Sequence, residues 1–152
     1  MTRTEKIIKP IHKEILLMME SSSRIYNQAL YFLRQAYFKT KEEGEIKTPS
    51  YNQLYHLVKN EDCYKASVLD GTVRQAAIKQ AYDNWKAFIK ATISYKKNPK
   101  EFTGRPKIPS YLKEGKLNVV TIDSSRLRKT GCKERTGSIA KIVLFSDSSS
   151  IH

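Results

Sequence analysis

The sequence contains little cysteine. Cys63 and Cys132 are the 2 cysteines in 152 residues, and neither has a cysteine or histidine at the spacing of a zinc site. This excludes a disulfide-rich scaffold and an evident zinc motif. A reduced, intracellular chain is the interpretation that fits best, and a single disulfide between the two is the alternative.

Long apolar segments are also missing. No stretch has the length and apolar character needed to span a bilayer. The N-terminus carries charges but lacks the apolar h-region of a signal peptide. We therefore expect no membrane partner and a cytoplasmic location.

The sequence shows no catalytic constellation. His12, His56 and His152 are too scattered for a metal site or a catalytic pair, and no Ser/His/Asp or Cys/His grouping has suitable spacing. Several of the few acidic residues cluster in a predicted loop around Gly44, where we expect them to be solvated. We expect no enzyme activity, no cofactor and no metal.

Positive charge is what the chain has in excess. It holds 28 lysines and arginines against 15 acidic residues, a net charge of +13 and a pI near 9.7. Such an excess favours a polyanionic partner, because basic side chains release condensed counterions when they meet phosphates. The alternative is a charge that only keeps the protein soluble. The length allows one domain, or two small ones, with a real core.

Apolar periodicity predicts three helices. The first spans about residues 11–41 and could kink at 21–23, where serines compete for backbone hydrogen bonds. A short second helix follows an N-cap at Ser50, and residues 60–64 are a predicted break. The third helix spans residues 73–93 and is expected to pack on the first.

Short strands are predicted outside the helices, at residues 3–9, 117–122 and 139–145. The segment from residue 96 is rich in lysine, arginine and proline and cannot form a regular helix. We therefore predict an α+β, mostly α, fold in which a three-helix bundle is inserted into a small sheet of N- and C-terminal strands. The predicted organisation is an N-terminal strand (1–10), a helical bundle (11–95), a basic loop with C-terminal strands (96–145) and a disordered tail (146–152).

Four segments together resemble a known family. They are Arg24-Ile25-Tyr26-Asn27-Gln28-Ala29-Leu30, Tyr51-Asn52-Gln53-Leu54, Val73-Arg74-Gln75-Ala76 with Ala81-Tyr82-Asp83-Asn84-Trp85-Lys86-Ala87-Phe88, and Gly104-Arg105-Pro106-Lys107-Ile108. In this order and spacing they resemble the N-terminal half of the OrfB/TnpB proteins. These are transposon-encoded, RNA-guided nucleases related to compact type V CRISPR effectors. The resemblance covers roughly residues 3–125.

The resemblance implies a wedge and recognition module without its nuclease. The family's RuvC-like domain holds two metal ions with three separated carboxylates, and neither it nor the family's cysteine-rich zinc insert has a counterpart here. The implied partners are a guide-type structured RNA and double-stranded DNA, with a separate chain as one source of the nuclease.

By position in the family, the residues nearest the DNA motif are Tyr51, Arg74, Gln75 and Thr121. Gln75 can pair with adenine, Arg74 with guanine or phosphate, and Thr121 with thymine. Each could instead serve packing. RNA or phosphate contacts are expected from two basic stretches: Lys96, Lys97, Lys100, Arg105, Lys107, Lys113 and Lys116 in one, and Arg126, Arg128 and Lys129 in the other.

Aromatic residues interleave the first basic stretch. Tyr95, Phe102 and Tyr111 could stack on unpaired bases or anchor the segment to the core. Two further functions remain open from the sequence. One is a small helix-turn-helix-like DNA-binding regulator that acts without RNA. The other is a helical protein-interaction scaffold that pairs through its tyrosine-rich first helix.

Overall fold

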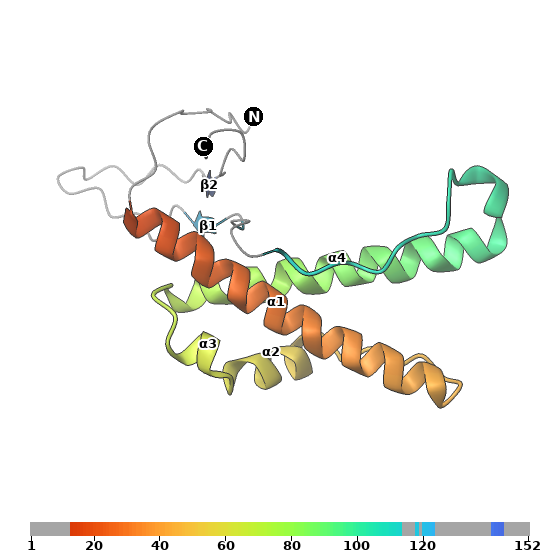
Figure 1. The fold of residues 1–152 in the computed structure, drawn as a ribbon, viewed down its shortest axis with the longest axis horizontal. Helices are drawn as coiled ribbons and strands as arrows, with labels where there is room; N and C mark the ends of the chain where they lie inside the picture. Colours follow the sequence, from red (N-terminus) through yellow and green to blue (C-terminus); the bar gives the residue numbers. More distant parts are fainter. Residues whose placement is uncertain (1–12, 114–117, 119, 124–140, 145–152) are drawn as a thin grey trace.

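A computed structural model describes residues 13–113, 118, 120–123 and 141–144. Two long helices dominate it (Figure 1). The elements in chain order are α1 (Lys13–Glu42), α2 (Tyr51–Lys59), α3 (Asp62–Lys65), α4 (Gly71–Lys97), the 3-10 turn η1 (Pro99–Glu101), β1 (Val120–Asp123) and β2 (Lys141–Leu144).

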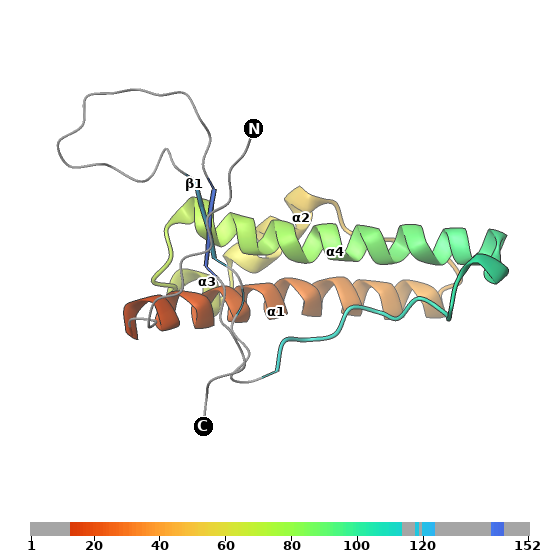
Figure 2. The same ribbon diagram turned by 90° about the horizontal axis from the view of Figure 1, so that it is seen from above.

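Helices α1 and α4 lie side by side and run in the same general direction (Figure 2). The short helices α2 and α3 connect the end of α1 to the start of α4. Both long helices place their apolar stripes against each other. Small residues at the contact, Ala29 on α1 and Ala77 and Ala81 on α4, are almost fully buried and allow close approach. Larger buried residues fill the space between them, among them Leu30, Leu33, Ile78 and Trp85.

The predicted α+β class is wrong. Helices make up most of the described residues, and no sheet there carries the bundle. Strands β1 and β2 have four residues each and pair antiparallel with each other, with Val120 opposite Leu144. The long helices bury most of the core among themselves, and Val120 of β1 joins one end of it. The predicted strand at 3–9 and the tail at 146–152 lie outside the described residues.

Three details of the helices differ from the prediction. Helix α1 continues without interruption through residues 21–23, where the Ser23 hydroxyl donates to the Met19 carbonyl at 3.0 Å within the helix. The short helix α3 begins within the predicted break at 60–64, so the described residues form four α-helices. Helix α4 continues to Lys97 and includes residues that were assigned to the irregular basic segment.

The N-cap at Ser50 is confirmed. The Ser50 hydroxyl accepts from the Gln53 backbone N–H at 3.4 Å, and the Gln53 side chain accepts from the Ser50 N–H at 2.9 Å. This reciprocal capping box satisfies two backbone donors at the start of α2. It fixes the position of Tyr51, the next residue.

Candidate nucleic-acid interface

Tyr51 and Gln75, two of the expected DNA contacts, meet where α2 packs on α4. The Tyr51 hydroxyl lies 3.5 Å from the Gln75 carbonyl oxygen, to which it donates. The Tyr51 ring packs edge-to-face on Tyr82, with centroids 5.9 Å apart. Tyr51 therefore ties the two helices together, while Gln75 is exposed.

Arg74 is held by α3. Its Nη1 donates to the Tyr64 carbonyl at 2.9 Å, and its guanidinium lies 4.7 Å from the centroid of the Tyr64 ring. The carbonyls in the last turn of a helix have no partner within that helix, and Arg74 supplies one of them with a donor. The guanidinium is thus engaged in joining α3 to α4 and is not presented as a free fork.

A tyrosine pair completes this cluster. The rings of Tyr55 and Tyr64 lie edge-to-face at 6.1 Å. Burial, together with a hydrogen bond to Tyr55, raises the pKa of Tyr64 to about 12. The same hydrogen bond lowers the pKa of Tyr55, and a hydrogen bond with Gln75 acts in the same direction. Gln75 is therefore the member of the expected DNA set whose side chain combines exposure with a polar setting.

Thr121 is not part of this cluster. It lies in β1 opposite Val143 of β2. Figure 1 shows β1 and α2 on opposite sides of the pair formed by α1 and α4. The structure therefore divides the expected DNA contacts between two places.

Residues 102–113, which we call the strap, run back along α1 in an extended conformation (Figures 1 and 2). Asn27 donates from Nδ2 to the Leu112 carbonyl at 3.0 Å, and its Oδ1 accepts from the Leu112 N–H at 2.9 Å. Arg34 donates from Nη1 to the Pro109 carbonyl at 2.8 Å. Ile108 and Leu112 pack against the core. The irregular backbone of the strap is thus held in place by two polar side chains of α1 and by two apolar side chains of its own.

Asn118, which follows the strap in the chain, also attaches to the long helices by hydrogen bonds. Its backbone N–H donates to the Ser23 hydroxyl at 2.9 Å. Its buried side-chain amide donates to the Ser22 hydroxyl at 3.1 Å and to Gln80 Oε1 at 3.0 Å. This residue therefore joins α1 and α4 at the end of the molecule where β1 begins.

The expected phosphate-binding residues that the structure describes are all exposed. They are Lys96 and Lys97 in the last turn of α4, Lys100 in η1, and Arg105, Lys107 and Lys113 on the strap. No described carboxylate lies within ion-pair distance of any of them. Lys116, Arg126, Arg128 and Lys129 lie outside the described residues.

The aromatic residues of the basic segment divide into two kinds. Tyr95 and Phe102 pack edge-to-face at 5.7 Å and are half-buried, so they anchor the turn after α4. Tyr111 lies 5.0 Å from the Arg34 guanidinium and keeps 41% of its surface exposed. On the neighbouring face of α1, Tyr31 and Phe38 are each 45% exposed, and Phe38 also faces Arg34 at 5.8 Å.

Arg34 and Asn27 organise this surface, and sequence reasoning assigned neither a role in holding the strap. Arg34 has no carboxylate three or four residues away on α1, so no ion pair within the helix competes for its guanidinium. Asn27 is a polar residue beside the buried Tyr26 and near the buried Ala29. Both features are visible in the sequence, but neither identifies the strap as the partner of these side chains.

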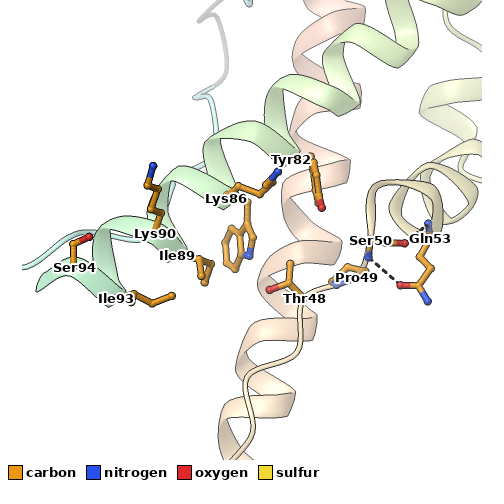
Figure 3. A pocket seen from close by; sticks show the side chains of 11 residues that line it. Thr48, Pro49, Ser50, Gln53, Tyr82, Lys86, Ile89, Lys90, Ile93 and Ser94 are labelled. Carbon is orange, nitrogen blue, oxygen red and sulfur yellow. Dashed lines mark hydrogen bonds between the residues drawn. The ribbon is translucent and has the colours of Figure 1, made fainter. Parts of the chain in front are cut away.

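A groove of about 600 Å³ lies between the segment before α2 and the second half of α4 (Figure 3). Ile89 and Ile93 lie on the α4 side, and Thr48 and Pro49 lie across from them. Its other lining residues are Ser50, Gln53, Tyr82, Trp85, Lys86, Lys90 and Ser94.

Within the part of the chain that the structure describes, no three His, Cys, Asp or Glu side chains lie close enough to hold a metal ion. Burial, and secondarily the charge of Glu61, raises the pKa of the Cys63 thiol. Cys132 lies outside the described residues. None of the described helices combines the length and hydropathy needed to cross a bilayer.

Comparison of the chain with models of protein families, with curated proteins and with solved structures finds no match.

Proposed function

We propose that this protein is a non-catalytic nucleic-acid-binding module whose partners are a structured, guide-type RNA and a short duplex DNA motif. The strap is the observation that carries the proposal. Its backbone is held against α1 by Asn27 and Arg34, while Arg105, Lys107 and Lys113 are exposed and face no described carboxylate. Cations on a fixed, extended backbone suit phosphates, whose contacts position a nucleic acid more than they select its sequence.

The charge around the strap supports this proposal. Between residues 21 and 41 of α1 every charged residue is basic, and so is every charged residue from 102 to 113. The exposed rings of Tyr31, Phe38 and Tyr111 lie on the same two segments. Aromatic rings next to cations bind unpaired bases by stacking while the cations follow the backbone.

The resemblance to the recognition half of the OrfB/TnpB proteins supports the same function and suggests the RNA partner. Of the DNA contacts that it implies, Gln75 is the one we retain as a base contact. Its side chain is exposed, and its amide, which hydrogen-bonds to Tyr55, keeps further donor and acceptor positions, whereas Tyr51 and Arg74 are engaged in joining helices. We propose no catalytic step for this chain.

The test is binding measured by fluorescence anisotropy across a range of salt concentrations, with structured RNA and with duplex DNA. The double variant Lys107→Gln/Lys113→Gln should weaken binding to all sequences and reduce the slope of log K against log salt by roughly 1 to 2. Lys59→Gln/Lys65→Gln, which removes equal charge from α2 and α3, is the matched control. Equal slopes in the two double variants would contradict the assignment of the strap.

The substitution Gln75→Ala tests the proposed base contact. It should reduce preference among duplex sequences, by about 1–3 kcal/mol at one base position, without changing the salt slope. Sequence-specific duplex binding by the protein alone, with no affinity for structured RNA, would replace the RNA-dependent module with a DNA-binding regulator. Absence of binding to either polymer at about 0.1 M salt would overturn the nucleic-acid function.

A further inference from the structure

The outer face of α4 carries a straight row of lysines. Lys79, Lys86, Lys90 and Lys97 follow one another at intervals of seven, four and seven residues, and all four are exposed. An α-helix turns by about 100° per residue, so these intervals keep the four side chains within an arc of about 40°. The row extends for about 27 Å along the helix axis. We call it the α4 ridge.

The α4 ridge points away from the bundle. The residues of α4 that are buried against α1, among them Ala77, Ala81 and Trp85, lie on the opposite side of the helix. Figure 3 shows the Lys90 side chain directed away from the groove beside α4. The strap is held on α1 by hydrogen bonds. The α4 ridge and the strap therefore lie on different faces of the molecule.

The charge on α4 is almost entirely positive. Its sequence holds six lysines and arginines and one carboxylate, Asp83. Asp83 pairs with Lys79 at 3.1 Å, whereas no described carboxylate lies within ion-pair distance of Lys86 or Lys90. The dipole of the helix favours Lys97 in its last turn, but it does not favour two lysines in the middle. Lys86 and Lys90 are four residues apart, and like charges at this spacing destabilise a helix. A bound polyanion would remove this repulsion.

The side chains between the lysines indicate which polyanion fits. On this face of α4, all of which the structure describes, the other exposed residues are Asp83, Ala87, Ile93 and Ser94, and none is aromatic. Unpaired bases bind by stacking on rings, which the strap surface has and this face lacks. A membrane surface requires an apolar band along the helix, and Ile93 alone does not form one. A duplex turns its bases inward and presents phosphates, which lysines contact directly.

We propose that the α4 ridge is a second phosphate-binding surface, which binds the backbone of a nucleic-acid duplex. The inference rests on the proposed nucleic-acid function and adds a surface to it. Lys86, Lys90 and Lys97 contact phosphates, and Asp83 weakens the contact of Lys79 by pairing with it. Because the strap lies on another face, one molecule can hold a duplex on α4 and an unpaired strand on the strap.

The experiment measures fluorescence anisotropy at about 0.1 M salt with a duplex and with a single strand of equal length. About 12 base pairs suffice, because at about 3.4 Å per step they exceed the length of the row. Lys86→Gln/Lys90→Gln should raise the Kd of the duplex roughly five- to fiftyfold and reduce its salt slope by about 1 to 2, with little change for the single strand. Lys59→Gln/Lys65→Gln, which removes equal charge, is the matched control.

Asp83→Asn should have the opposite effect on the duplex. It frees Lys79 and removes the carboxylate of this face, so we expect the Kd of the duplex to fall roughly two- to fivefold. Glu45→Gln is the matched control, because Glu45 is also an exposed carboxylate that pairs with one lysine, Lys47, at 2.9 Å. It should leave the Kd unchanged. Equal effects of the two substitutions would overturn the proposal.

The outcomes distinguish the α4 ridge from the strap. If Lys86→Gln/Lys90→Gln binds the duplex as its control does, while Lys107→Gln/Lys113→Gln binds nucleic acid more weakly, the ridge proposal is wrong and the nucleic-acid function stands. Equal weakening of duplex and single strand in Lys86→Gln/Lys90→Gln would also overturn it. So would binding of these lysines to phosphatidylserine vesicles but not to the duplex. If wild-type protein binds neither nucleic acid, both proposals fail.

Discussion

Asn27 and Leu112 are separated by 85 residues and exchange two hydrogen bonds at 3.0 and 2.9 Å. An asparagine side chain carries the same donor and acceptor as a peptide group, so Asn27 pairs with the strap backbone as a neighbouring strand would. These two bonds satisfy the backbone N–H and carbonyl of Leu112, which lies in neither a helix nor a sheet. The strap therefore has a defined path although it belongs to neither a helix nor a sheet.

Replacing Asn27 should loosen this attachment. We expect Asn27→Ala to lower the free energy of unfolding by about 1–3 kcal/mol, because the Leu112 N–H and carbonyl lose their partners in a partly buried place. Urea denaturation measures the change. Asn52→Ala, at an exposed position on α2, is the control. A similar small effect for both variants would show that the two hydrogen bonds contribute little.

Arg34 should be sensitive even to a conservative change. Arg34→Lys keeps the charge but loses the planar guanidinium that lies beside Phe38 and Tyr111 and donates to Pro109. We expect the free energy of local opening of the strap to fall by about 1–2 kcal/mol. Trypsin cleavage after Lys107 should then be roughly five- to thirtyfold faster. The measurement is limited proteolysis under native conditions. The matched control is Arg24→Lys, at an exposed position on the same helix. Equal cleavage rates in the two variants would show that Arg34 does not hold the strap in place.

Trp85 should tolerate loss of its nitrogen better than loss of its ring. Its Nε1–H has no partner among the described residues, whereas its ring packs against Tyr37 and Phe88 at 5.6 and 5.5 Å. We expect Trp85→Phe to cost less than about 1.5 kcal/mol and Trp85→Ala about 3–5 kcal/mol. Thermal and urea unfolding of the two variants test this. A loss in Trp85→Phe as large as that in Trp85→Ala would contradict this expectation.

Tyr64 should titrate with a pKa well above that of an unperturbed tyrosine. Its pKa is raised to about 12 in the folded protein, against 10.0 for an unperturbed tyrosine. Because the folded-state value is the higher one, its contribution to stability is fully present below pH 10 and is lost as the pH rises towards 12. Titration of the phenolate absorbance should show a group near 12 that is absent from Tyr64→Phe and from wild-type protein in urea.

The control for that titration is Tyr31→Phe, which changes an exposed tyrosine of α1. It should leave the group near 12 in place. If Tyr64→Phe also leaves a group near 12 in place, the burial of Tyr64 does not raise its pKa in solution.

The sequence by itself determined what depends on near neighbours in the chain. The capping box of Ser50 and Gln53 uses residues three apart, and the stripe from Val73 to Trp85 repeats at helical spacing, so both were predictable. The excess of cations was visible from composition and the basic tract from the order of residues. The three expected helices are present, and the first continues as one helix through the serines at 21–23.

Only the tertiary structure decided how distant segments use their polar groups. The expected base contacts Tyr51 and Arg74 are engaged in joining helices, because the Gln75 carbonyl and the Tyr64 carbonyl lie within reach only once α2, α3 and α4 have packed. The expected bundle is present, but among the described residues the sheet that was expected to carry it is limited to the β1–β2 pair, and the strap is held on α1. The apolar stripes predicted that the first and third helices pack together, but the partners of single polar side chains depend on the packing of the whole chain.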